Sequence, residues 1–134
     1  MSGEKDLRAM LQGMSPVLNA GEFVFCSFPD STYGDHPQME PVASVIEPEG
    51  LTLVLPRSQA DEHGIHYDAV FKCITLMLHS SLEGVGLTAA VSTRLAAVGI
   101  SANMIAGFYH DHVYVPEADA LQAVQSIRDL AADS

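Results

Sequence analysis

The stretch from Tyr67 to Leu78 constrains the fold more than any other part of the chain. It is almost continuously apolar and contains β-branched and aromatic residues (YDAVFKCITLML), as in a strand that is buried on both faces of a sheet. A loop with two glycines follows at 79–86 (HSSLEGVG). After it, apolar residues recur at the spacing of one helix face, at Leu87, Val91, Leu95 and Val98. The pattern predicts a buried strand, a loop and a crossover helix.

The rest of the C-terminal half adds two strands and a helix. We expect strands over Ile100–Gly107 and Asp111–Val115, with a tight connection between them. Pro116 then opens a helix whose apolar residues repeat at Leu121, Val124, Ile127 and Leu130. The order strand–helix–strand–strand–helix is ferredoxin-like topology without its closing strand. Because an exposed edge is a liability, we expect Glu22–Phe28 or a second subunit to pair there.

The N-terminal half predicts a second, reduced copy of this arrangement. We expect a short helix over Glu4–Leu11 before the first strand, and a turn-rich loop over Pro29–Pro41 between the first strand and the next two. Strands are expected over Glu22–Phe28, Val42–Ile46 and Leu51–Leu55, and a helix over Arg57–His63. The fold class is therefore α+β, with ferredoxin-like antiparallel sheets covered by helices on one face. We expect two halves, residues 1–66 and 67–134, with the loop replacing a crossover helix in the first.

Charge and hydropathy limit the partners and the location. The chain has seventeen acidic and six basic side chains, and thus a net charge of −11. Nucleic acid and anionic membranes are therefore poor partners. The segment Met1–Leu11 has no apolar signal-peptide core, and nothing approaches the ~20 apolar residues of a membrane span. We therefore expect a cytoplasmic protein. Cys26 and Cys73 form no CxxC motif, which excludes a zinc ribbon and indicates buried thiols.

Several of these segments resemble the ACT domain. The similarity covers Ile74–Ile105 and rests on the apolar strand, the loop SSLEGVG, the helix end LAAVGI and the strand NMI. The segment Asp111–Val124 (DHVYVPEADALQAV) is similar to the end of aspartate-kinase ACT domains. The whole chain resembles small stand-alone bacterial proteins with two ACT-like halves, through Gly21–Cys26 (GEFVFC) and Glu49–Pro56 (EGLTLVLP).

The resemblance implies a non-enzymatic regulatory module without a cofactor. It would bind an amino acid or a similar small molecule at an interface between paired domains, and the chain would form a homodimer. Carried over by position, it implies ligand contacts from the loop and from the following strand. These residues are Ser81, Leu82, Glu83, Gly84, Val85, Ser101 and Asn103. Two departures leave the ligand open. Ser101 stands where aspartate kinases often have asparagine, and Glu83-Gly84 replaces their usual Pro-Gly.

The loop allows two interpretations from its residues alone. Gly84 and Gly86 let the backbone approach a ligand and offer N–H groups to a carboxylate, and Glu83 suits an ammonium group, so an amino acid fits. Alternatively, Ser80 and Glu83 form an ordinary helix capping box.

The histidines support a further alternative. His110 and His112 project to one face of a regular strand, and with His79 they would make a three-histidine metal site in a small metal-dependent enzyme. Hydrogen-bonded or surface histidines are the commoner state. A pure protein-interaction subunit, which pairs its sheet with another protein, is the third hypothesis.

Overall fold

The computed structural model describes residues 6–78 and 84–134. The chain divides into two compact units, and the first of them combines residues 1–20 with residues 72–134, while the second comprises residues 21–71. The division of the sequence into halves 1–66 and 67–134 stays a prediction. Among the described residues, no helix is long and apolar enough to cross a membrane.

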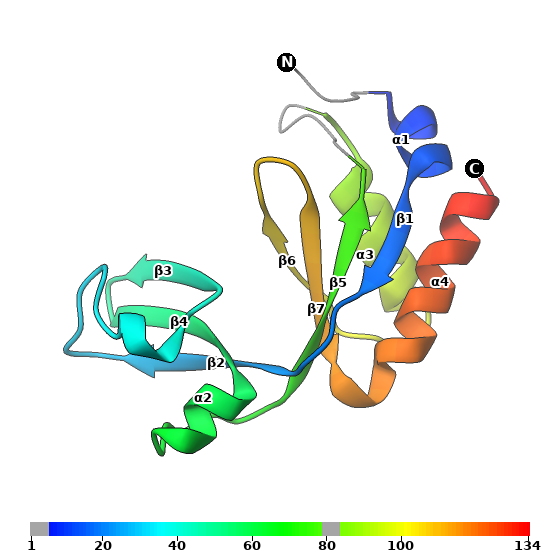
Figure 1. Cartoon of the computed structure of the whole chain (residues 1–134). Helices are drawn as coiled ribbons and strands as arrows, with labels where there is room; N and C mark the ends of the chain where they lie inside the picture. Colours follow the sequence, from blue (N-terminus) through cyan, green and yellow to red (C-terminus); the bar gives the residue numbers. More distant parts are fainter. Residues whose placement is uncertain (1–5, 79–83) are drawn as a thin grey trace. The chain divides into compact units, whose positions relative to one another are not determined.

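The first unit is a complete ferredoxin-like fold (Figure 1). Its strands lie in the order β1–β5–β7–β6. Helix α3 connects β5 to β6, α4 follows β7 as the last element, and α1 packs beside both helices. The elements are α1 (Leu7–Gly13), β1 (Ser15–Leu18), β5 (Phe71–Met77), α3 (Leu87–Ala97), β6 (Asn103–Ala106), β7 (Asp111–Pro116) and α4 (Ala120–Ala132), with a 3₁₀ turn over Glu117–Asp119 before α4.

Strand β1 supplies the closing strand that the C-terminal half lacks. It pairs antiparallel with β5, Ser15 opposite Met77 and Leu18 opposite Ile74. Of the two expected partners for this edge, Glu22–Phe28 and a second subunit, the first pairs with β5 at one position only, Phe23 opposite Phe71, and β1 pairs with residues 74–77. The sequence pattern does not predict β1, because this strand has only four residues and contains Pro16. Proline is tolerated there because an edge strand does not need every N–H for the ladder.

The core of the first unit lies between its sheet and its helices. Ile74 and Leu76 of β5 and Val113 and Val115 of β7 are at most 1% exposed, and they pack against α1, α3 and α4. The buried residues of α4 are Ala120, Ala123, Val124, Ser126 and Ile127. Leu121, which we expected in this stripe, is instead 78% exposed. A repeat of three residues drifts around a helix with 3.6 residues per turn.

The second unit is a reduced version of the same fold. It contains β2 (Phe23–Phe28), a 3₁₀ helix over Pro37–Met39, β3 (Ala43–Glu47), β4 (Gly50–Pro56) and α2 (Arg57–Glu62). The strands lie in the order β3–β4–β2, antiparallel throughout, and Phe71 lies opposite Phe23. Buried residues of β2, β4, the 3₁₀ helix and α2 form its core: Val24, Cys26, Met39, Leu51, Leu53, Leu55 and Ala60. The loop Pro29–Pro41, which was predicted in place of a crossover helix, contains this 3₁₀ helix, and the α+β ferredoxin-like fold class is confirmed.

Candidate ligand-binding site

The loop before α3 is described from Gly84 onward, and Ser81, Leu82 and Glu83 lie outside the described residues. Val85 is 81% exposed. Gly86 occupies the N-cap position of α3, with φ +104° and no side-chain cap, so the helix does not start at the Ser80 capping box. A Cβ on Gly86 would lie 3.0 Å from Cδ2 of Leu7. Both the positive φ and this contact therefore call for glycine.

The predicted contacts from the second strand lie at the start of β6. Ser101 and Asn103 are both exposed, and Asn103 is opposite Tyr114 of β7. Among the described residues, β6 pairs with β7 alone, so it is an edge of this sheet. The N–H of Gly107 donates to the carbonyl of His110 at 2.9 Å. Since hydrogen-bonded pairs alternate along an antiparallel ladder, the backbone groups of Met104 and Ala106 point to the open side.

Among the described residues, the structure does not bring the predicted loop and strand contacts together within one unit. Gly84 and Val85 precede the first turn of α3, and Ser101 and Asn103 follow its last turn. An eleven-residue helix is about 16 Å long. Strands β5 and β6 run in the same direction on either side of this crossover (Figure 1).

A chain of polar side chains crosses the face of the sheet opposite the helices. The side-chain amide of Asn19 donates to Oγ1 of Thr75 at 2.8 Å and to the carbonyl of Cys73 at 3.2 Å. Oγ1 of Thr75 lies 2.9 Å from Nδ1 of His112. Thr75 is only 8% exposed. The three side chains thus link the end of β1 with β5 and β7.

Sequence reasoning missed Asn19 and Thr75. They are 56 positions apart, and a contact across strands at that distance leaves no local pattern. The available signal was the alternation along β5, where Cys73 and Thr75 alternate with the core residues Ile74 and Leu76.

Burial shifts the proton affinities on this face. It lowers the pKa of His112, and the nearby His110 adds to that shift, while Asp111 opposes it. Burial also raises the pKa of the Asp111 carboxyl and of the Tyr114 hydroxyl, to which Cys73 contributes. A neutral His112 can accept a hydrogen bond at Nδ1 from the Thr75 hydroxyl, while the Thr75 oxygen accepts one from the Asn19 amide. All three groups are then satisfied.

The histidines do not form a metal site within the described residues. His110 lies in the connection before β7, and its Nδ1 is 3.3 Å from the carbonyl oxygen of Leu78. Nδ1 of His112 is engaged with Thr75. In the part of the chain that the structure describes, no three His, Cys, Asp or Glu side chains gather where they could hold a metal ion. His79, the third expected ligand, is outside that part.

Comparison with solved structures identifies similar folds. A Vibrio cholerae protein of unknown function, titled a possible transport protein, is 50% identical, with a TM-score of 0.86 over 95% of this chain and 97% of that one. The ligand-free regulatory subunit of aspartate kinase from Thermus thermophilus is 10% identical, with a TM-score of 0.60 over 86% of this chain and 95% of that one. Clostridium acetobutylicum aspartate kinase is 13% identical, with a TM-score of 0.61 over 88% of this chain and 34% of the enzyme.

Sequence comparison assigns the family. No curated protein matches the chain. One ACT-domain family model matches residues 2–72, which is more than half of the chain, and a second matches residues 69–129. The resemblance seen in the sequence is thereby confirmed, and the chain belongs to the ACT-domain family, with two ACT matches in tandem.

Proposed function

We propose that this chain is a non-enzymatic regulatory module of the cytoplasm that binds an amino acid and works as a homodimer. Membership of the ACT-domain family supports ligand binding and regulation. The similarity to a protein titled a regulatory subunit of aspartate kinase is a similarity of fold, and it is compatible with an amino acid as the ligand.

The observation that carries the proposal is the separation of the two predicted contact groups by α3. If two copies pair along β6 in an antiparallel sense, the start of one β6 meets the end of the other. Asn103 of one copy then approaches the end of the partner sheet where β5 leads into the glycine-containing loop. The two groups, which lie at opposite ends of α3 in one unit, would come together across the interface without any change within the unit.

The chemistry of the two groups suits the two ends of an amino acid. Backbone N–H groups around Gly84 and Val85, near the start of α3, can donate to a carboxylate, which the helix dipole favours. The exposed amide of Asn103 can accept from an ammonium group and donate to a carboxylate. Ser81, Leu82 and Glu83 complete the proposed site, with Glu83 as the partner for the ammonium group.

The charge distribution is compatible with self-association through the first unit. Residues 1–20 and 72–134 carry eight acidic and five basic side chains, so this unit is close to balanced. Two copies of it can approach each other with little long-range repulsion.

A thermal-shift screen of the twenty amino acids tests the proposal. A ligand that binds only the folded state raises the free energy of unfolding by about 2.7 kcal/mol at a hundred times its dissociation constant. We expect a saturable rise in the melting temperature with one amino acid or a small group of them. No rise with any of them at millimolar concentration would reject the proposal.

A further inference from the structure

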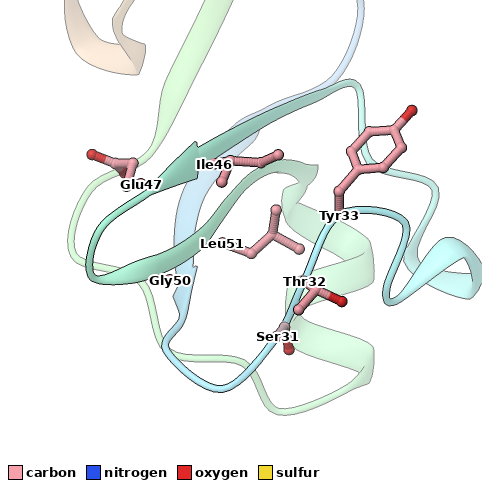
Figure 2. Close-up of a pocket in the computed structure, with 7 residues that line it drawn as sticks. All are labelled: Ser31, Thr32, Tyr33, Ile46, Glu47, Gly50 and Leu51. Atoms are coloured by element: carbon pink, nitrogen blue, oxygen red, sulfur yellow. The ribbon is translucent and has the colours of Figure 1, made fainter.

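The second unit carries a pocket beside its edge strand that is separate from the site proposed above. The pocket has a volume of about 420 Å³ and lies between the β3–β4 hairpin and the loop that follows β2. Figure 2 shows the side chains of Tyr33, Ile46 and Leu51 around it, and the carboxylate of Glu47 turned away from Ile46 and Leu51. The volume falls within the range of about 300–1,000 Å³ that is usual for ligand sites, and its wall is mainly apolar.

The loop on one side of the pocket is held firmly in place. The Ser31 hydroxyl is 2.8 Å from Nε2 of His36, whose ring stacks on Phe28 at a centroid distance of 4.5 Å. The backbone N–H of Thr32 donates to the Asp35 carboxylate at 2.8 Å. His36 adopts φ +63°, a left-handed conformation that costs free energy in a residue other than glycine. This wall of the pocket is therefore pre-formed and does not need to be ordered by a ligand.

Large, mainly apolar side chains are exposed along β3 and on the loop that follows β2. Ile46 is 72% exposed, Tyr33 75%, and Val45 50%. Among the described residues, β3 pairs with β4 alone, so one row of its backbone N–H and C=O groups faces outward. Val45 and Ile46 are consecutive and thus project to opposite faces. An exposed edge strand that is apolar on both faces can accept a further strand.

The negative charge of the second unit indicates which kind of partner can bind at β3. Residues 21–71 contain nine acidic side chains and one basic side chain, Arg57. Its guanidinium is engaged by the Glu22 carboxylate at 2.9 Å and by the Tyr67 hydroxyl at 3.1 Å. Glu47 and Glu49 stand at the end of β3. A second copy of this unit would repel it, and an anion finds no free cationic partner in the unit.

We infer that β3 and the adjoining pocket bind an extended, basic segment of another protein. The segment adds to β3 as an antiparallel or parallel strand, inserts one apolar side chain between Tyr33, Ile46 and Leu51, and places lysine or arginine near Glu47 and Glu49. Backbone hydrogen bonds supply affinity, and the pocket and the acidic side chains supply specificity. This surface would connect the ligand-binding unit to the protein that it regulates.

Fluorescence anisotropy with defined peptides tests the inference on the full-length chain. The probe is a labelled peptide of about seven residues, longer than a typical strand, with lysine at both ends, leucine at the centre and threonine between. Three further peptides serve as comparisons: one with glutamate for lysine, one with the same residues in scrambled order, and one with proline beside the leucine, which cannot complete a ladder.

Two variants locate the binding. Ile46→Ser removes an exposed apolar side chain from the pocket wall. Leu121→Ser removes one from α4 that is similarly exposed, at 78%, and serves as the matched control. We expect saturable binding of the probe, with at least about tenfold weaker binding of all three comparison peptides and of the Ile46→Ser variant, which corresponds to about 1.4 kcal/mol. Leu121→Ser should bind like the unaltered chain.

Three results would overturn the inference. Equal binding of the scrambled peptide means that only the net charge attracts the probe. If N-acetyl-leucine methylamide displaces the labelled probe as well as the unlabelled peptide does, the pocket holds a small molecule and not a strand. A dimer in light scattering that Ile46→Ser converts to a monomer means that β3 pairs with a second copy. None of these results depends on whether an amino acid binds the first unit.

Discussion

Oγ1 of Thr75 lies 2.9 Å from Nδ1 of His112 and 2.8 Å from the side-chain nitrogen of Asn19. One hydroxyl thus ties together three strands on the helix-free face of the first unit. Because Thr75 is 8% exposed, water is poorly placed to replace it.

Replacing Thr75 by valine should destabilise the fold. Valine keeps the shape of threonine but removes the hydroxyl, so the Asn19 amide loses an acceptor. A buried polar group without its partner costs about 1–3 kcal/mol. Urea unfolding followed by circular dichroism gives the free energy. Thr93→Val, at an exposed position of α3, is the control and should change it by less than about 0.5 kcal/mol. Equal effects of the two variants would contradict a special role for the Thr75 hydroxyl.

The folded state should lose stability in mild acid because of His112. Its pKa in the folded protein is below its ordinary value of 6.5, so the unfolded chain takes up the proton first as the pH falls. The contribution of His112 to the free energy of unfolding is therefore fully present above about pH 6.5. It is lost as the pH falls from there through the lower pKa of the folded state. Asp111 acts in the opposite sense at lower pH, because its folded pKa is above 3.8 and the folded state binds that proton first.

The variant His112→Asn isolates this effect. Asparagine can still hydrogen bond Thr75 but does not titrate. Urea unfolding at a series of pH values should show a smaller loss of stability below pH 6.5 than in the unaltered chain. The variant His63→Asn, at an exposed position, controls for exchanging a histidine for an asparagine elsewhere in the chain. An unchanged slope in His112→Asn would show that another group causes the acid sensitivity.

Gly86 should tolerate alanine less well than Gly64 does. Gly64 has φ +65° and open space around a new Cβ, whereas Gly86 has φ +104° and Leu7 Cδ2 at 3.0 Å. The first change costs about 1 kcal/mol for a left-handed alanine. The second adds a less favourable φ and a close contact, so we expect a cost of about 2–3 kcal/mol. Thermal unfolding of the two variants checks the order, and a smaller effect at Gly86 would refute it.

Dimerisation through β6 should depend on the outward-facing N–H of Ala106. Ala106→Pro removes this donor from the open edge, and the β6–β7 ladder does not use it. Light scattering should give a mass near twice 14.3 kDa for the unaltered chain and for Ala106→Ser, which keeps the N–H. It should give the monomer mass for Ala106→Pro. A dimer that persists in Ala106→Pro would place the interface elsewhere.

Local patterns in the sequence predicted most of the elements, and long-range pairing accounts for what they missed. The strand before Leu78 and the helix from Leu87 follow from apolar runs and spacing. The strand Ser15–Leu18 did not, because Pro16 and its short length conceal it, and its partner lies about sixty positions away in β5. For the same reason Asn19 and Thr75 escaped notice, although His112 was singled out.

The candidate site shows the same division. The resemblance to the ACT domain predicted Gly84 and Asn103 as contacts from their positions in the sequence. Only the fold shows that α3 lies between them. The pocket beside Ile46 depends on a loop conformation in which His36 has a positive φ. The presence of a histidine in a turn-rich segment does not predict this conformation.

Titration calorimetry with the amino acid that raises the melting temperature most tests the central claim directly. We expect one molecule bound per chain, and at least about tenfold weaker binding in Asn103→Ala, since a lost hydrogen bond to a charged group costs about 1.5–3 kcal/mol. Gln122→Ala, an exposed amide on α4, should bind as the unaltered chain does. Absence of binding, or equal binding in all three proteins, would contradict an amino-acid site that includes β6.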